Sequence, residues 1–327
     1  MSLASSNIDA HSVTTSAAAP RIRVGFIVGP TGVGKSALAL EIAAALGAEI
    51  VNADSRQLYR GMDLGTAKPS AADRARIAHH LIDVRAPDEP LDAAGFAALA
   101  HRAIAEIAAR GRRVLVVGGS GLYLRALRDG IFAGPPASIA IRKELRGEAA
   151  EHGASSLHQR LSAIDASAAA RISPNDLMRI IRALEVYALT GVALSEHHRR
   201  HRFGASQYTS LTVALNRPRA ELYAEIDRRF DAMIAAGLIE ETRALMATGY
   251  DAGAPPLNTI GYREVACFIR GEISLAQACA RARQESRRLA KRQLTWFRAE
   301  PEIIWLDADR ALPQALRLFE EFFADSV

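Results

Sequence analysis

The sequence predicts an α/β fold in which helices cover both faces of a parallel sheet and a helical insertion interrupts the chain. Short apolar runs alternate with helical segments from Ile22 to Gly121, an order that is typical of parallel sheets. A glycine-rich turn joins the first apolar run to the first helical segment. Between about Pro135 and Tyr208 the periodicity is helical only, and strand-like runs return afterwards.

The individual elements are predicted from their composition and from the residues that end them. The run at residues 22–28 is apolar and rich in β-branched residues, which predicts a buried strand. Further short apolar runs predict strands at residues 49–52, 114–117, 211–215 and 303–306. Helices are expected at residues 37–46, 96–110 and 177–190. Gly111 and Gly191 are placed to end the last two, and Asp176 is placed to cap the third.

These elements divide the chain into three parts. Residues 1–21 are rich in Ser, Ala and Thr and lack a long apolar stretch, which predicts a disordered tail. Residues 22–136 and 210–327 are expected to form the α/β core, with basic helices in its C-terminal part. Residues 137–209 are expected to form the helical insertion domain.

The overall composition is that of an ordinary globular protein. The chain has 327 residues, of which 49% are hydrophobic and 24% are charged, with a net charge of +5. It contains no apolar run of roughly 18 residues, so we expect no membrane span. Its two cysteines, Cys267 and Cys279, form neither a zinc motif nor a disulfide framework, which fits a reducing cytoplasm.

The glycine-rich turn matches the pattern G-x-x-x-x-G-K-[ST] at every fixed position, between a predicted strand and a predicted helix. The glycines let successive main-chain N–H groups turn toward one anion, and the start of the helix adds positive potential. The lysine supplies a charge and the serine can bind Mg²⁺. The sequence therefore predicts a P-loop NTPase-like core whose diphosphate or triphosphate site consists of Gly29, Pro30, Thr31, Gly32, Val33, Gly34, Lys35 and Ser36.

The phosphate loop alone does not identify the reaction. ATPases, GTPases and kinases usually carry an acid at the end of a second strand to hold Mg²⁺. Here the strand at residues 114–117 continues into Gly118-Gly119-Ser120-Gly121 instead. The acid that does end a strand is Asp54, and that strand is the one after the loop's own helix. This departure argues against simple nucleotide hydrolysis.

Several longer motifs resemble the tRNA dimethylallyltransferases, also called isopentenyl-tRNA transferases. The resemblance covers roughly residues 24–306, in the right order. It rests on the segment DSRQLYRGMDLGTAKP that begins at Asp54, on HHLID from His79, VGGSGLY from Val117, PND from Pro174, RALEV from Arg182, GYR from Gly261 and LAKRQLTWFR from Leu289.

The resemblance implies transfer of a dimethylallyl group from dimethylallyl diphosphate to the amino group of the adenine just 3′ of the tRNA anticodon, with Mg²⁺ as cofactor. It implies that Asp54 is the general base, that Lys35 and Arg229 face the diphosphate, that Ser120 lies beside the adenine and that Ser36 binds Mg²⁺. The positions that match tRNA contacts of the family are Asp54, Ser55, Arg56, Gln57, Ser120, Arg142, Met178, Arg179, Ile180, Ile181, Arg182, Asn258, Thr259, Ile260, Gly261, Tyr262, Arg263, Lys291, Arg292, Gln293, Leu294, Thr295, Trp296, Phe297 and Arg298.

Other interpretations stay open at this point. An enzyme that prenylates free AMP would share the loop and the base, although it would not need the insertion or the C-terminal basic helix. A small-molecule kinase and a non-catalytic RNA-binding protein also fit the loop. Asp54 is also placed to cap the following segment, and Trp296 and Phe297 are also suited to core packing. We expect His197, His198 and His201 to form a solvated or RNA-facing surface rather than a metal site, and the chain to be a monomer.

Overall fold

The computed structural model describes residues 21–132, 134–200, 207–250 and 257–324. Its strands form one parallel sheet in the order β3-β2-β4-β1-β5-β6. The strands are β1 (Ile22–Val28), β2 (Ala48–Asn52), β3 (His79–His80), β4 (Arg113–Gly118), β5 (Tyr208–Asn216) and β6 (Ile303–Asp307). The α-helices are α1 (Lys35–Leu46), α2 (Ala71–Arg76), α3 (Ala93–Ala109), α4 (Gly121–Asp129), α5 (Ile139–His152), α6 (Ala154–Ile164), α7 (Ala166–Ala169), α8 (Leu177–Thr190), α9 (Leu194–Arg200), α10 (Arg219–Ala235), α11 (Leu238–Ala247), α12 (Tyr262–Ile269), α13 (Leu275–Arg298) and α14 (Ala311–Ala324).

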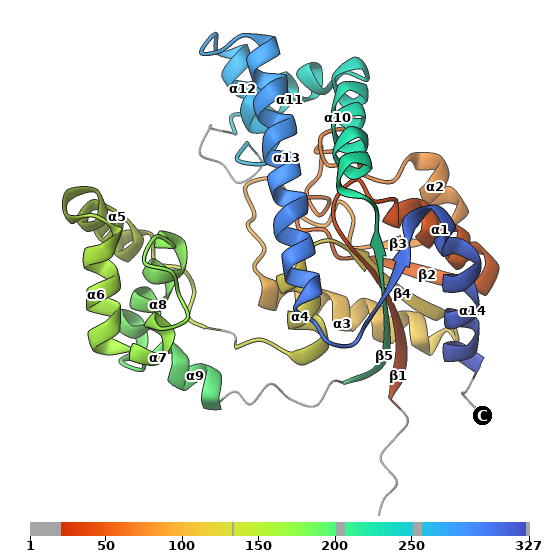
Figure 1. The fold of residues 1–327 in the computed structure, drawn as a ribbon, viewed down its shortest axis with the longest axis horizontal. Coiled ribbons are helices and arrows are strands. Elements are labelled where there is room, and N and C mark those ends of the chain that lie inside the picture. The colour runs from red at the N-terminus through yellow and green to blue at the C-terminus, as the bar shows by residue number, and fades with distance from the viewer. Residues whose placement is uncertain (1–20, 133, 201–206, 251–256, 325–327) are drawn as a thin grey trace, which may run out of the picture.

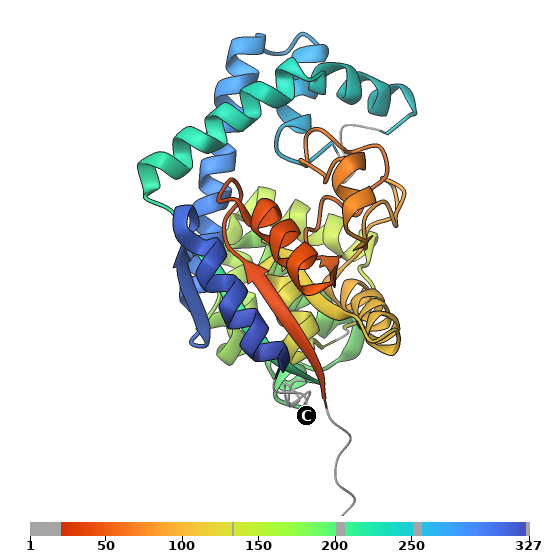
Figure 2. The ribbon, with the colours of Figure 1, turned by 90° about the vertical axis from the view of Figure 1, so that its right-hand side faces the viewer.

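Helices cover both faces of the sheet, as the alternating pattern predicts. Along β1, Phe26 packs with α3 and α4 in one hydrophobic core, whereas Ile27 packs with α1 and α14 in the other. Successive strand residues point to opposite faces, so one apolar strand serves both cores. Figure 2 shows α1 and α14 side by side over one face. Gly25 permits this packing, because a β-carbon there would lie 2.7 Å from the ring of Phe319.

The carboxyl ends of the central strands meet at one edge of the sheet. The pairing of the strands places Val28 beside both Gly118 and Ala214, and Asn52 beside Val117. The loops that follow β1, β2, β4 and β5 therefore leave the sheet at the same level. In open parallel sheets this edge is where ligands bind.

A helical layer lies beyond this edge of the sheet. Helices α10 to α13 pack around Tyr59 and Met62 in a third core, and the long helix α13 runs from this layer down to α4 (Figure 1). Helices α5 to α9 form a separate group beside the sheet, and α5 to α8 surround a core of their own that includes Leu157, Ile180 and Leu184 (Figure 1). This group accounts for the helical periodicity of the predicted insertion.

The predicted elements and the observed ones differ mainly at their ends. Strand β1 and helix α8 have the predicted bounds, and the side chain of Asp176 caps α8 by accepting the N–H of Arg179. Strand β5 begins at Tyr208, so residues 208–209, which we expected in the insertion, belong to the sheet. The two-residue strand β3 was not predicted, because an edge strand this short leaves no pattern.

Two other expectations concern residues that the structure describes. Cys267 and Cys279 are free thiols. Across the described ranges, no helix combines the length and apolar character that a membrane span requires. The predicted tail lies, apart from residue 21, outside the described residues, and so does His201.

Candidate active site

The glycine-rich turn forms a loop between β1 and α1 that only glycine can build at three positions. Gly29, Gly32 and Gly34 have φ angles of 139°, 79° and 103°, which other residues rarely adopt. Two of them are also close to neighbouring elements. A β-carbon at Gly29 would lie 3.0 Å from the carbonyl oxygen of Leu215, and one at Gly32 would lie 2.8 Å from the side chain of Ile226. The loop thus has the compact shape of an anion site.

Lys35 lies at the start of α1 and its side chain folds over the loop. Its Nζ donates a hydrogen bond of 2.7 Å to the carbonyl oxygen of Pro30. Burial lowers the pKa of Lys35 to about 8; the carboxylate of Asp54 opposes this shift and the charge of Arg229 adds to it. Lys35 is therefore mostly a cation at neutral pH. Among the charges that act on it, one acid, Asp54, faces the two cations Lys35 and Arg229.

Asp54 follows the end of β2 and is held there by a buried asparagine. The side chain of Asn52 accepts the N–H of Asp54 at 3.2 Å and donates to the carbonyl oxygen of Leu81 at 3.1 Å. One carboxylate oxygen of Asp54 accepts the N–H of Arg56 at 2.8 Å, so Asp54 does cap the turn that follows it. The charges of Lys35 and Arg229 both act on this carboxylate. Asp54 therefore caps the following turn and also contributes its charge to the site of Lys35 and Arg229.

The glycine-rich segment after β4 lies against this carboxylate loop. A β-carbon at Gly118 would lie 2.2 Å from the carbonyl oxygen of Ala53, which excludes any larger residue. The hydroxyl of Ser120 accepts the N–H of Ser55 at 3.0 Å. Ser120 therefore fixes the residue next to Asp54, a contact that the sequence did not predict.

Helix α13 closes the remaining side of the site through Gln293 and Trp296. The side-chain carbonyl of Gln293 accepts the N–H of Thr31 at 2.8 Å, and its amide donates to the carbonyl oxygen of Gly119 at 3.0 Å. A β-carbon at Gly119 would lie 2.4 Å from Gln293, and one at Gly121 would lie 2.4 Å from Trp296. The glycines after β4 thus allow α13 to approach the phosphate loop.

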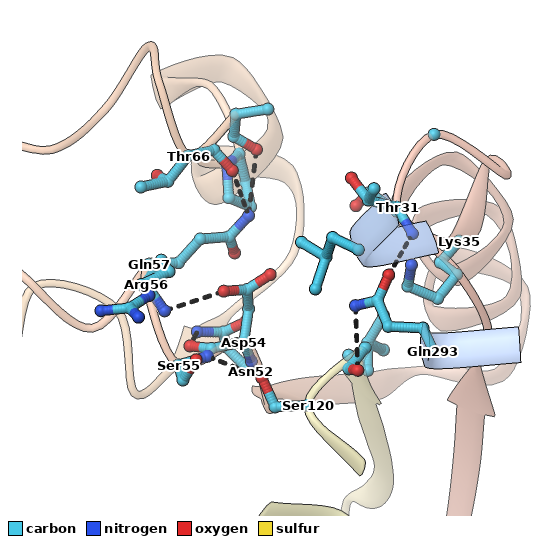
Figure 3. A pocket seen from close by; sticks show the side chains of 18 of the residues that line it. Thr31, Lys35, Asn52, Asp54, Ser55, Arg56, Gln57, Thr66, Ser120 and Gln293 are labelled. Carbon is cyan, nitrogen blue, oxygen red and sulfur yellow. Dashed lines mark hydrogen bonds between the residues drawn. The ribbon is translucent and has the colours of Figure 1, made fainter. Parts of the chain in front are cut away.

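These elements enclose one large cavity of about 1000 Å³, at the top of the range of roughly 300–1,000 Å³ that is typical of ligand sites. Figure 3 shows Lys35 and Thr31 on one side of it and Asp54 with Ser55 and Gln57 on the other. The residues predicted for the site that line this cavity are Thr31, Gly32, Gly34, Lys35, Ser36, Asp54, Ser55, Arg56, Gln57, Ser120, Arg229, Thr259, Ile260, Arg292, Gln293 and Trp296. The structure thus brings the predicted anion site and the predicted base to one cavity.

Several side chains predicted to contact a diphosphate or a tRNA are instead buried. Ile180 and Ile181 pack in the core of the insertion, and Phe297 packs against α3 and α4. Tyr262 is fully buried, donates to Glu241 and accepts the N–H of Gly65 at 3.1 Å. Val33 is buried beneath the loop, so only its main chain can face an anion. The motifs therefore contain positions that pack in the core as well as positions on the surface. The side chains at the core positions present no surface to a ligand.

Two predicted tRNA-contacting arginines in the insertion are held by one buried acid. Arg142 donates to both carboxylate oxygens of Glu185, at 2.8 and 2.9 Å, and Arg182 donates to one of the same oxygens at 2.8 Å. Burial opposes ionisation of Glu185, but these bonds and the N–H of Ser138 lower its pKa to about 2. Met178 and Arg179 lie at the start of α8, and the side chain of Met178 is 64% exposed.

The basic helix α13 carries both paired and unpaired cations. Arg283 and Arg287 pair with acids on α10, and Arg288 pairs with Glu285. Among the described residues, Lys291 and Arg292 lie in no ion pair, and both are exposed. Leu294 is partly buried against the sheet, whereas Thr295 and Arg298 are exposed. Asn258, Gly261 and Arg263 lie outside the cavity wall, and Arg263 pairs with Glu264.

The two histidines of the predicted cluster that the structure describes both lie against one aromatic ring. His197 stacks on Phe132 with ring centroids 4.3 Å apart, and His198 meets the same ring edge-on. No cluster of three metal-binding side chains exists among residues 21–132, 134–200, 207–250 and 257–324. Mg²⁺ usually takes one or two protein oxygens and completes its shell with phosphate and water. The hydroxyl of Ser36, which lines the cavity next to Lys35, fits that mode of binding.

A glycine-rich loop after β1, a carboxylate just after β2 and a basic helix meet at one cavity, an arrangement that suits a group-transfer enzyme. The chain belongs to the IPP transferase family, whose model matches residues 57–300. It is 50% identical over 287 residues to a tRNA dimethylallyltransferase of Geobacter metallireducens, covering 88% of this chain and 93% of that protein.

Two solved structures are also similar to most of the chain. One is the tRNA isopentenylpyrophosphate transferase of Bacillus halodurans, with a TM-score of 0.69 and 37% identity, covering 93% of this chain and 97% of that one. The other is a eukaryotic dimethylallyltransferase acting on tRNA, with a TM-score of 0.79 and 25% identity, covering 93% of this chain and 80% of that one.

Proposed function

We propose that this protein transfers a dimethylallyl group from dimethylallyl diphosphate to the exocyclic amino group of the adenine 3′ of the anticodon in tRNA. The observation that supports this function most directly is that Asp54 and the phosphate loop line one cavity. The family and its curated tRNA dimethylallyltransferase relatives support the same reaction. The cavity has room for an adenine on the side of Asp54 and a diphosphate on the side of Lys35.

In the proposed reaction the adenine nitrogen attacks the allylic carbon while the carbon–oxygen bond to diphosphate breaks. The nitrogen gives its proton to the carboxylate of Asp54, which acts as the general base. Asn52, Ser120 and the N–H of Arg56 hold this carboxylate and its loop in place. The base is therefore positioned before the substrates bind.

The departing diphosphate gathers negative charge as the bond breaks. The N–H groups of the phosphate loop, the ammonium of Lys35 and the guanidinium of Arg229 are the donors available to it. Burial lowers the pKa of Arg229, and the charge of Asp54 opposes that shift. Both cations gain electrostatic stabilisation when an anion enters. Mg²⁺ bound by Ser36 would neutralise part of the diphosphate charge.

The tRNA would reach the cavity along α13. The adenine must leave its stack to enter the site. Lys291 and Arg292 are exposed and lie in no ion pair among the described residues, so they are available to the phosphates of a tRNA. The ring of Trp296 lines the cavity, with the guanidinium of Arg125 4.6 Å from its centroid. The monomeric state and the cytoplasmic location expected from the sequence stay predictions.

Prenyl transfer from labelled dimethylallyl diphosphate, measured separately on tRNA and on AMP, tests this function. We expect the label in tRNA and not in AMP, because the basic helix and the insertion offer surface that a mononucleotide does not need. Incorporation into AMP alone would remove the tRNA assignment. ATP or GTP turnover without a prenyl donor would favour a kinase or a nucleotide switch.

A further inference from the structure

Arg217 lies beside the phosphate loop, although no motif pointed to it. It comes directly after β5, and every residue of β1 pairs with a residue of β5. Leu215, two residues earlier, has its carbonyl oxygen 3.0 Å from the place of a β-carbon at Gly29. The side chain of Arg217 lines the same cavity as Lys35 and Arg229.

The guanidinium of Arg217 has an unused donor. Its Nη2 donates to the carboxylate of Asp309 at 2.6 Å. Its Nε is buried and has no hydrogen-bond partner within the described part of the chain. Buried donors are normally satisfied, and one that is not calls for an acceptor. Arginine presents several donors in a fixed planar fork that matches phosphate oxygens.

The charges of Arg217 and Arg229 both act on one acid of α10, Glu225. Glu225 precedes Ile226, the residue that packs against Gly32 of the loop. The hydrogen bond from Arg228 lowers the pKa of Glu225, burial opposes this, and the charges of Arg217 and Arg229 lower it further. Both arginines are therefore near Glu225, on the side of the loop that faces β5 and α10.

We propose that Arg217 is a second arginine that binds the diphosphate: a small shift of its side chain would uncover the Nε–H for a phosphate oxygen while Asp309 holds the rest of the guanidinium. This role rests on the proposed function, since it assigns a further contact to the same leaving group. It adds a donor from β5 to those that the loop, Lys35 and Arg229 supply. The ion pair with Asp309 pre-orients the donor, which reduces the entropy lost on binding.

Calorimetric titration of the full chain with inorganic pyrophosphate and magnesium tests this contact without tRNA. We expect Arg217→Ala to weaken the affinity about tenfold or more, because a hydrogen bond to a charged group is lost. Arg217→Lys keeps the charge, so its affinity for pyrophosphate should lie between those of the wild type and Arg217→Ala. Arg219→Ala is the matched control, because Arg219 is exposed, lies two residues away and contacts the ring of Tyr223.

Asp309→Asn separates binding from a structural role. It removes the charge partner of Arg217 but leaves the arginine in place, so its effect on pyrophosphate should be smaller than that of Arg217→Ala. An unchanged affinity in Arg217→Ala, or an equal loss in both variants, would overturn the contact. In steady-state assays Arg217→Ala should raise the KM for dimethylallyl diphosphate and leave that for tRNA unchanged.

The outcome for Arg217 can be told apart from that for the proposed function. Prenyl transfer to tRNA by the wild type, with pyrophosphate affinity that does not depend on Arg217, would remove only this contact. Pyrophosphate binding that depends on Arg217, without prenyl transfer, would keep the contact and remove the function. A wild type that does neither would overturn both.

Discussion

Gln293 on α13 holds the main-chain N–H of Thr31 in the phosphate loop at 2.8 Å, although 262 positions separate the two residues. The amide group of the same side chain donates to the carbonyl oxygen of Gly119 at 3.0 Å. One side chain therefore joins the loop after β1, the loop after β4 and the basic helix. The helix proposed to meet tRNA is thus connected to the proposed diphosphate site.

Replacing Gln293 by alanine should disturb this junction. Two hydrogen bonds are lost, each worth about 1 kcal/mol, so we expect transfer to fall by up to roughly thirtyfold. The KM values for both substrates should change, because Gln293 touches the phosphate loop and belongs to α13. Gln284→Ala is the control on the same helix, since Gln284 is exposed and lies outside the cavity wall. Normal kinetics in Gln293→Ala would show that the junction is dispensable.

Asp54→Asn should slow transfer at least about 100-fold while tRNA binding is kept, because the amide cannot accept the proton. Single-turnover transfer and a filter-binding assay for tRNA measure the two effects. Asp88→Asn serves as the control, as Asp88 is exposed and outside the cavity wall. A near-normal rate in Asp54→Asn would refute the base role.

The salt dependence of tRNA affinity should report on the unpaired cations of α13. Each phosphate contact contributes roughly 0.7–0.9 to the slope of log affinity against log salt. Lys291→Ala with Arg292→Ala should therefore reduce that slope by about 1.5. The matched control is Arg283→Ala with Arg288→Ala, which removes two cations that already pair with Asp231 and Glu285. Equal reductions in both double variants would mean that α13 attracts tRNA only through its total charge.

The affinity for pyrophosphate should fall as pH rises through the pKa of Lys35. Burial lowers that pKa to about 8, so the ammonium is present below pH 8 and is lost above it. A single proton linked to binding changes the affinity by up to roughly tenfold per pH unit. Lys35→Ala is the reference, because its pH profile reports the ionisation of the ligand alone. Parallel profiles for the two proteins would contradict the role of Lys35.

The insertion should lose stability in acid through Glu185. Its pKa is lowered from 4.5 to about 2, so its contribution is complete above about pH 4.5 and is lost as pH falls toward 2. Glu185→Ala leaves Arg142 and Arg182 without their acid and should cost about 3–5 kcal/mol. Glu148→Ala, which breaks an exposed pair with Arg160, should cost less than about 1 kcal/mol. Chemical denaturation as a function of pH measures both, and similar losses would contradict the special role of Glu185.

Local patterns in the sequence predicted five of the six strands that the structure describes and three of its fourteen α-helices. The apolar run of β1 and the limits of α8, between Asp176 and Gly191, have their causes within a few residues. The phosphate loop was predicted for the same reason, because its glycines serve the shape of the loop itself. The family motifs then indicated which residues gather around the loop. Asp54, Ser120 and Gln293, which belong to three of these motifs, do line one cavity.

What the sequence by itself determined is the chemistry that each segment can supply: an anion loop, a carboxylate at a strand end and a basic helix. Only the tertiary structure decided which members of a motif face a ligand. Tyr262 and Phe297 are buried whereas Trp296 lines the cavity, and Arg217 joins the site from a strand without a motif. The physical reason is that burial and cavity position depend on how distant segments pack, and a linear pattern records only the periodicity of its own segment.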